Sequence, residues 1–196
     1  MNVILTGMRG TGKSSLGAIL AERLGFAFID TDVAIETLAG VRIEEIVARH
    51  GWDHFRALER RVIANLVAAD RQVIASGGGT LIDEENAARL KAQGIVILLV
   101  CALPILQQRI AGGRNRPSLT GHGSAVAELE EVWQARRARY AAVADLTYDV
   151  SMESDDPMQD LQRKTAAIHA LLLQTARFTA ADIQARSPKA IEEHTS

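Results

Sequence analysis

Short apolar runs alternate along this chain with longer segments in which apolar residues recur every three or four positions. The short runs are NVILT at 2–6, FAFI at 26–29, QVIAS at 72–76, GIVILLV at 94–100 and LTYDV at 146–150. The longer segments are SLGAILAERL, two stretches between Ala34 and Ala69, EENAARLKAQ, and a stretch from about Met158 to Gln174. Strands that alternate with helices are typical of βαβ units. We therefore predict an α/β fold of three layers, with helices on both faces of a parallel, five-stranded sheet.

Glycine and aspartate mark the ends of several predicted helices. Gly25 follows the first helix and Gly94 the fourth, while Asp83 precedes the fourth helix as an N-cap. The stretch AGGRNRPSLTGHGS at 111–124 is rich in glycine and has no periodicity, which is typical of a mobile lid. We expect residues 1–176 to form one domain and residues 177–196 to form a flexible tail.

Composition and charge exclude several classes of protein. Apolar residues make up 47% of the chain and charged residues 23%, as in soluble globular proteins. The net charge of -2 lacks the basic excess of a nucleic-acid-binding protein. The longest apolar stretch, GIVILLVCALPIL, is too short to span a membrane and contains a proline. The start of the sequence shows no secretory signal, and we expect a cytoplasmic protein. We also expect a monomer with neither nucleic-acid nor membrane partners.

The cysteine and the histidines give no sign of a catalytic thiol or a zinc site. Cys101 is the single cysteine and lies in an apolar run, where a buried, inert thiol is the expected state. The five histidines do not show the spacing of metal ligands.

The segment GMRGTGKSS at 7–15 carries the strongest chemical signal in the chain. Gly7, Gly12, Lys13 and Ser14 match the pattern Gly-x-x-x-x-Gly-Lys-Ser/Thr between a predicted strand and a predicted helix. In such a loop, the glycines let backbone N–H groups converge on phosphate oxygens, as expected here for Gly10 to Gly12. Lys13 reaches the β- and γ-phosphates, and the Ser14 hydroxyl is available to Mg²⁺. A flexible glycine turn would not explain the lysine and the serine.

Two aspartates follow the second predicted strand, at the edge where open α/β sheets bind their ligands. We expect Asp30 and Asp32 to point to opposite sides of an extended segment and to divide two tasks. The alternative is that one of them only caps a helix beginning at Val33.

Arg56, Glu59 and the triple glycine Gly77, Gly78 and Gly79 are further candidates. Arg56 and Glu59 are three residues apart on one helical face, which by itself favours an ordinary surface ion pair. Three glycines directly after a predicted strand allow the backbone to approach a ligand closely, although a tight turn is the alternative.

Several of these motifs together resemble the shikimate kinase family of P-loop kinases. The resemblance covers residues 1 to about 150 and rests on GMRGTGKS, FIDTDVAIE, HFRALE, ASGGGT, RPSL and RRARYAAVAD, in that order. It implies transfer of the ATP γ-phosphoryl group to the 3-hydroxyl of shikimate, with ATP as co-substrate and Mg²⁺ as cofactor, in aromatic amino acid biosynthesis.

The resemblance also implies roles for individual residues. Asp30 would lie near Mg²⁺ with Ser14, and Asp32 would contact the acceptor hydroxyls and accept a proton. The carboxylate of shikimate would be bound by Arg56, oriented by Glu59, together with Arg116 and Arg136, in a pocket lined by the three glycines. The nucleotide would contact Gly10, Thr11, Gly12, Lys13, Ser14, Ser15 and Arg116, and Arg109 would pack on the adenine. Lys13, Asp32 and Arg116 would act in catalysis.

Two other functions remain open at this point. Another small-molecule kinase of the same fold, such as a gluconate kinase, also binds a polyhydroxylated carboxylate, although the combined motifs argue against it. A non-catalytic sensor could use the kinase fold to bind a ligand and control a partner. Such a protein would not be expected to keep Lys13, Ser14, Asp30 and Asp32 together.

Overall fold

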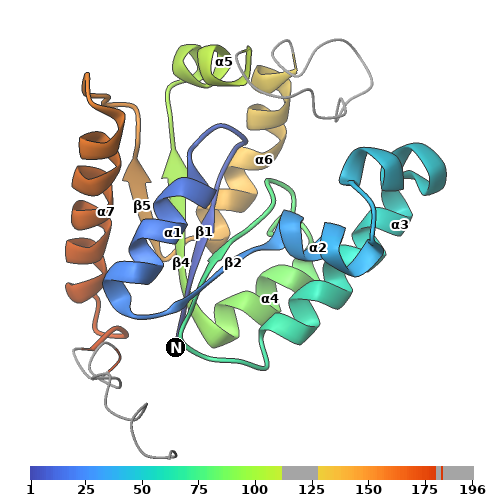
Figure 1. Ribbon diagram of the computed structural model, residues 1–196, viewed down its shortest axis with the longest axis horizontal. Helices are drawn as coiled ribbons and strands as arrows, with labels where there is room; N and C mark the ends of the chain where they lie inside the picture. The colour runs from blue at the N-terminus through green and yellow to red at the C-terminus, as the bar shows by residue number, and fades with distance from the viewer. Residues whose placement is uncertain (112–127, 180–181, 183–196) are drawn as a thin grey trace, which may run out of the picture.

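The computed structural model describes residues 1–111, 128–179 and 182, in which five strands and seven helices follow one another along the chain (Figure 1). The strands are β1 (Asn2–Thr6), β2 (Ala27–Asp30), β3 (Gln72–Ala75), β4 (Gly94–Val100) and β5 (Leu146–Asp149). The helices are α1 (Lys13–Leu24), α2 (Thr31–Ala39), α3 (Ile43–Leu66), α4 (Glu84–Gln93), α5 (Leu103–Ala111), α6 (Leu129–Val143) and α7 (Pro157–Leu173). The predicted lid at 111–124 lies almost entirely outside the described residues.

The five strands form one parallel sheet in the order β2-β3-β1-β4-β5. The central strand β1 pairs with β3 on one side and with β4 on the other. Because every strand points the same way, the segments that follow β1, β2 and β3 meet at one edge of the sheet. The phosphate-loop sequence follows β1 and the triple glycine follows β3. Asp30 is the last residue of β2, and Asp32 lies in α2, which begins directly after it. The predicted parallel sheet of five strands is therefore confirmed.

Alternate residues of the strands enter two separate hydrophobic cores. Val3 and Leu5 pack with residues of α1 and α7 on one face of the sheet. Ile4 lies between them in sequence and packs on the opposite face, with residues of α3, α4 and α6. Leu20 of α1 is also fully buried in the first core. These two cores give the three layers that the sequence predicts, and they explain why the central strands are apolar on both faces.

The start of α2 differs from the expectation for the two aspartates. The helix begins at Thr31 rather than at Val33, and Asp30 caps it by accepting hydrogen bonds from the backbone N–H groups of Asp32 and Val33. Residues two apart in a strand lie on the same face, so the expectation of opposite sides does not hold even for an extended segment. Asp32 in fact lies in the first helical turn and not in an extended segment. The physical reason is that the Asp30 carboxylate satisfies N–H groups at the helix start.

α3 is bent at Gly51, where the backbone has φ 78° and ψ 174°. Side chains disfavour this conformation strongly, and glycine adopts it readily. The bend divides α3 into two segments and places Trp52, Phe55 and Arg56 at the start of the second one.

The first residues of the expected tail are packed against the domain. Phe178 is 3% exposed and lies in the core beside Phe26, with ring centroids 6.2 Å apart. Arg177 forms an ion pair with Asp145 at 3.6 Å, and the guanidinium group of Arg71 lies over the Phe26 ring. The predicted boundary at residue 176 is thus too early, because an isolated phenylalanine in an aperiodic segment gives no periodic signal.

Within the ranges that the structure describes, no helix has both the length and the apolar character needed to cross a bilayer.

Candidate active site

The loop between β1 and α1 has the geometry of a phosphate-binding loop. Gly7, Gly10 and Gly12 all have positive φ angles, and a Cβ atom at Gly7 would lie 2.3 Å from the carbonyl oxygen of Leu99. α1 begins at Lys13, so its N-terminal N–H groups face the loop. The Lys13 ammonium group donates to the carbonyl oxygens of Gly7 and Met8, at 3.0 and 2.8 Å. The Lys13 side chain therefore folds back over the loop and is hydrogen-bonded to its backbone.

Thr11 and Ser15 flank this loop in different ways. Thr11 is buried, and its hydroxyl donates to the carbonyl oxygen of Met8 at 2.9 Å, which fixes the turn. Ser15 is exposed at the start of α1. Its hydroxyl can contact a ligand, whereas Thr11 can offer only its backbone.

Ser14 and Asp30 bring two hard oxygen donors together. The Ser14 hydroxyl donates to Asp30 Oδ2 at 2.5 Å, while Asp30 Oδ1 caps α2. Hydroxyl and carboxylate oxygens suit Mg²⁺, which usually keeps several waters and takes few protein ligands when it also binds phosphates. In the described residues, no cluster of three or more His, Cys, Asp or Glu side chains is arranged to hold a metal. The donor set therefore fits a magnesium ion shared with a nucleotide, and not a metal held by protein groups alone.

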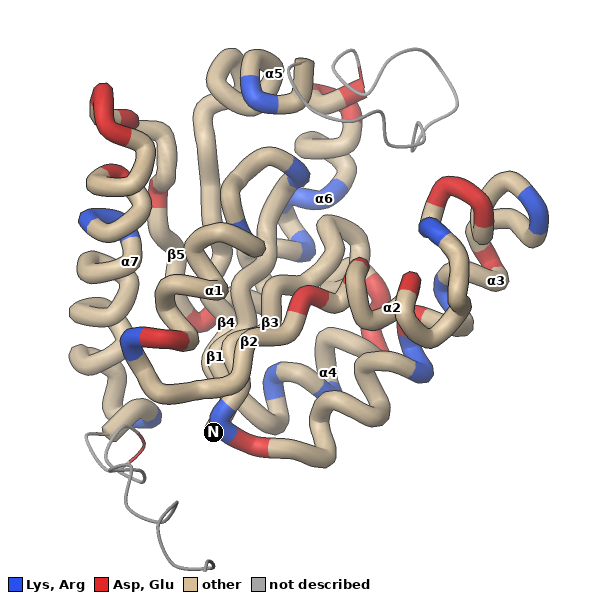
Figure 2. Tube along the Cα trace, viewed as in Figure 1, with Lys and Arg blue, Asp and Glu red and all other residues tan. Residues whose placement is uncertain are grey.

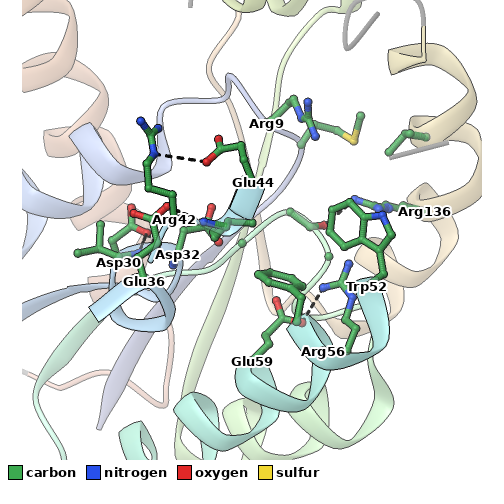
Figure 3. A pocket seen from close by; sticks show the side chains of 18 of the residues that line it. Arg9, Asp30, Asp32, Glu36, Arg42, Glu44, Trp52, Arg56, Glu59 and Arg136 are labelled. Carbon is green, nitrogen blue, oxygen red and sulfur yellow. Dashed lines mark hydrogen bonds and ion pairs between the residues drawn. The ribbon is translucent and has the colours of Figure 1, made fainter. Parts of the chain in front are cut away.

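A cavity of about 310 Å³ lies next to the phosphate loop, between the loop, α2, α3 and α6. Figure 3 shows Asp30, Asp32 and Glu36 on one side of it, and Arg56 and Arg136 on the other. The same separation is visible along the chain trace, where acidic positions gather at the start of α2 and basic positions lie on α6 (Figure 2). Arg42 lies beside these acids and Glu59 lies beside Arg56, so each side carries both charges. The side with Arg56 and Arg136 is called the cationic wall below.

Each of the three glycines after β3 leaves room for one charged side chain. A Cβ atom at Gly77 would lie 2.7 Å from Asp32 Oδ1, and a Cβ atom at Gly79 would lie 2.6 Å from an Nη atom of Arg56. At Gly78, a Cβ atom would meet Arg136 Nη1 at 3.7 Å. None of these three residues has a positive φ angle, so space and not backbone conformation favours glycine at positions 77 and 79. The 3.7 Å distance at Gly78 is an ordinary van der Waals contact, which a Cβ atom could make. The alternative of a simple tight turn does not explain these contacts.

Arg56 is held in place from two directions. Its Nη1 donates to Glu59 Oε2 at 2.6 Å, and Glu59 Oε1 accepts from the Thr80 hydroxyl at 2.7 Å. Glu59 is 1% exposed and Thr80 is fully buried, so this is not the surface ion pair that the spacing alone favours. The Arg56 guanidinium also lies over the rings of Trp52 and Phe55, at 5.7 and 5.1 Å from their centroids. Its position is therefore fixed before any ligand binds.

Arg136 reaches the same cavity from α6. Its Nη1 donates to the carbonyl oxygen of Gly78 at 3.1 Å, and the hydroxyl of Tyr140 donates to the same oxygen. Burial raises the pKa of Tyr140, although the neighbouring Arg136 guanidinium lowers it in part. The phenol therefore keeps the proton that it donates. This carbonyl connects the middle of the glycine segment to α6.

A second cavity of about 380 Å³ lies on the other side of the phosphate loop. It is lined by Gly10, Gly12 and Ser15 of the loop and α1, by Arg109 of α5, and by Glu153 and residues of α7. Half-buried Cys101 lies next to Arg109, and burial raises the pKa of its thiol, in line with an unreactive cysteine.

The structure brings most of the predicted site residues into these two cavities. The cavity between the phosphate loop, α2, α3 and α6 is called the acceptor-side cavity from here on, and it is lined by Asp30, Asp32, Arg56, Gly77, Gly78, Gly79 and Arg136. The second cavity, beside α5, is lined by Gly10, Thr11, Gly12, Ser15 and Arg109. Lys13 and Ser14 lie between them at the start of α1. Arg116 lies outside the described residues.

Residues that the motifs did not single out also line the acceptor-side cavity, among them Trp52, Phe55, Arg9 and Glu128. Trp52 lies four positions before Arg56, so helical spacing could have indicated that Trp52 is a neighbour of Arg56. Phe55 directly precedes Arg56. Arg9 and Glu128 approach each other to 4.0 Å, and Glu128 is 3% exposed. No local sequence signal connects this second pair, because its members are far apart in the chain.

Comparison with known proteins decides the family. The sequence profile described as "Shikimate kinase" matches residues 9–169. The chain belongs to the shikimate kinase family. Members of the shikimate kinase family are ATP-dependent kinases, in agreement with the phosphate loop, and the predicted fold and family resemblance are confirmed.

Similar proteins cover nearly the whole chain. A shikimate kinase from Synechococcus elongatus is 38% identical over 94% of this chain and 95% of its own. One from Geobacter metallireducens is 40% identical over 78% of this chain and 84% of its own. The solved structure of shikimate kinase from Acinetobacter baumannii in complex with shikimate is 31% identical, with a TM-score of 0.77 over 88% of this chain and 92% of its own.

Proposed function

We propose that this protein transfers the γ-phosphoryl group of ATP to the 3-hydroxyl of shikimate, giving shikimate 3-phosphate and ADP. One observation carries the proposal in addition to the family. The guanidinium groups of Arg56 and Arg136 converge on the glycine segment of a cavity that has Asp32 on its opposite wall and the phosphate loop beside it. Such a cavity suits a ring alcohol that carries a carboxylate.

The cationic wall would bind the carboxylate of the acceptor. Arginine guanidinium groups bind carboxylates through two parallel hydrogen bonds, which fix orientation as well as charge. Glu59, Trp52 and Phe55 hold Arg56 in advance, so little side-chain entropy is lost when the acceptor binds. Arg136 is similarly held at Gly78. The ring hydroxyls would then face Asp32.

The nucleotide would lie along the phosphate loop. Backbone N–H groups from Gly10 to Gly12 and the start of α1 would bind its phosphates, with Lys13 moving from its own loop carbonyls to the β- and γ-phosphates. Ser14 and Asp30 would hold Mg²⁺, which neutralises phosphate charge when bound. Ser15 and Arg109 would contact the remainder of the nucleotide from the second cavity.

In the chemical step, the acceptor oxygen forms a bond to the γ-phosphorus while the bond to the β–γ bridging oxygen breaks and ADP leaves. Asp32 takes the proton of the attacking hydroxyl. Lys13 stabilises the charge on the phosphoryl oxygens, which is the main requirement of a loose transition state. Arg116, in the family's RPSL segment, would add a further positive charge on the same group.

We also propose that the protein acts as a monomer, since the phosphate loop, Asp32, Arg56 and Arg136 of one chain already meet at one cavity. The cytoplasm is the compartment that supplies the ATP.

The proposal is tested by measuring ADP release in a coupled assay with Mg²⁺ and ATP, with shikimate and gluconate as parallel acceptors. We expect turnover with shikimate and not with gluconate. In Lys13→Met, turnover should fall by at least about a hundredfold, because one preorganised positive charge is removed from the transferring group. Preference for gluconate would identify a different small-molecule kinase, and tight shikimate binding without turnover would identify a non-catalytic sensor. Either result overturns the proposal.

A further inference from the structure

The guanidinium group of Arg109 is held along both of its edges. Nε and Nη2 donate to Glu153 Oε1 at 3.0 and 2.7 Å, and Nη2 lies 3.4 Å from the carbonyl oxygen of Val150. On the opposite edge, Nη1 donates to the carbonyl oxygen of Gly10 at 3.0 Å and lies 3.8 Å from Cys101 Sγ. These hydrogen bonds lie in the plane of the group, so a ligand can meet Arg109 only through a face.

The cavity beside Arg109 suits a flat aromatic ring. Gly10 and Gly12 of the phosphate loop form one side of it, and Leu16 and Leu161 supply apolar surface. The Arg109 side chain is 26% exposed, which leaves part of it accessible. A guanidinium face stacks favourably on an aromatic ring, and the ring next to a bound triphosphate is the nucleotide base.

We propose that Glu153 is a positioning residue for the nucleotide base. It fixes the plane of the Arg109 guanidinium, and this plane presents a face to the base. The inference rests on the proposed function, in which ATP is the phosphoryl donor, and it extends that function to a residue in the connection between β5 and α7. Glu153 touches neither the phosphates nor the acceptor cavity; it acts through Arg109.

The charge of Glu153 matters more for orientation than for stability. Its side chain is 51% exposed, and exposed ion pairs contribute little to the stability of a fold. Arg109 has several rotatable bonds, so an unrestrained guanidinium would lose entropy when it stacks on a base. Glu153 reduces this loss by holding two N–H groups of one edge.

A consequence is that Glu153 should affect the base and not the phosphates of a nucleotide. The contact between Arg109 and Gly10 uses the opposite edge and is retained when Glu153 is changed. The phosphate loop should therefore keep its conformation in a Glu153 variant.

The test compares Glu153→Ala with Asp155→Asn by calorimetric titration of ADP and of pyrophosphate, both with Mg²⁺. Asp155 is an exposed acid of the same connection, so its substitution changes the charge equally without touching Arg109. In Glu153→Ala, which removes the acceptor oxygen, we expect the Kd of ADP to rise about three- to tenfold, within the range of a cation–π contact, and the Kd of pyrophosphate to stay within about twofold. Asp155→Asn should change neither value by more than about twofold.

Three results would overturn the inference. One is an unchanged Kd of ADP in Glu153→Ala, and another is an equal rise for ADP and pyrophosphate, which would indicate a general disturbance of the loop. The third is an equal effect of Asp155→Asn, which would indicate a diffuse effect of charge. Neither titration needs an acceptor or turnover, so a failure of the proposed shikimate reaction is measured separately and is not confused with these results.

Discussion

At the scale of single residues, the acceptor-side cavity depends on side chains that hold other side chains. Glu59 accepts from Arg56 with one carboxylate oxygen and from Thr80 with the other. Thr80 is fully buried and Glu59 is 1% exposed, so neither group can replace its partner with bulk water. The Thr80 hydroxyl therefore positions the Glu59 carboxylate, and the Glu59 carboxylate positions the Arg56 guanidinium.

Replacement of Thr80 tests this chain of hydrogen bonds. Thr80→Val keeps the shape of the side chain but leaves a buried carboxylate oxygen without its donor, which costs about 1–3 kcal/mol. We expect the free energy of unfolding to fall by that amount and the KM for shikimate to rise severalfold, with the KM for ATP unchanged. Urea denaturation and steady-state kinetics measure both. Thr80→Ser retains the hydroxyl and should keep most of both properties; equal losses in the two variants would contradict the role of the hydrogen bond.

At the scale of secondary-structure elements, the cavity depends on the start of α2 and on the bend in α3. Asp30 ends β2 and caps α2, which brings Asp32 into the first helical turn beside Gly77. The bend at Gly51 begins the helical segment that carries Trp52 and Arg56. The start of α2 thus sets the position of Asp32, and the bend in α3 sets the position of Arg56.

The bend at Gly51 gives a prediction about stability. A Cβ atom there would meet nothing within 4 Å, so any penalty of Gly51→Ala comes from the backbone conformation alone. We expect this substitution to destabilise the protein by about 1–3 kcal/mol in urea denaturation. In a regular helix the same change would stabilise it by about 1 kcal/mol.

Exposed Ala48, in the helical segment before the bend, provides the matched control. Ala48→Gly should destabilise the protein by about 1 kcal/mol, since the backbone there is helical. A stabilising effect of Gly51→Ala alongside a destabilising Ala48→Gly would contradict the bend.

The same elements mark where sequence-based prediction succeeds and where it fails. The phosphate loop is predicted in full, because the conformation of a glycine-rich loop is encoded in its own residues. The first turn of α2 is not, because two aspartates compete to cap one helix and the sequence does not decide between them. The three glycines do indicate a close approach, yet the groups that crowd Gly77 and Gly79 come from α2 and α3. Contacts between such distant segments leave no local pattern in the sequence.

At the scale of the whole molecule, the chain after α7 completes the core between α1 and α7. Phe178 packs beside Phe26, which is itself covered by the Arg71 guanidinium. Phe26 and Phe178 lie far apart in the sequence, and such a contact leaves no periodic signal. The sequence alone therefore places the start of the tail at residue 177, before Phe178. The core that supports α1, and with it the phosphate loop, therefore extends beyond residue 176.

Phe178→Ala should reduce the free energy of unfolding by about 3–5 kcal/mol, as is usual for a buried phenylalanine. Met152→Ala is the control, because Met152 is 72% exposed and should change stability by less than about 0.5 kcal/mol. Urea denaturation measures both variants. Similar, small effects would show that Phe178 is not part of the folded core.

The central claim is that fixed guanidinium groups hold a carboxylated acceptor next to the phosphate loop, and the KM for shikimate of Arg56→Ala tests it most directly. We expect that KM to rise about ten- to a hundredfold, equivalent to the loss of one charge-assisted hydrogen bond, while the KM for ATP changes little. Arg61→Ala, an exposed arginine of the same helix, should leave both values unchanged. A KM for shikimate in Arg56→Ala equal to that of the unmodified protein would contradict the claim.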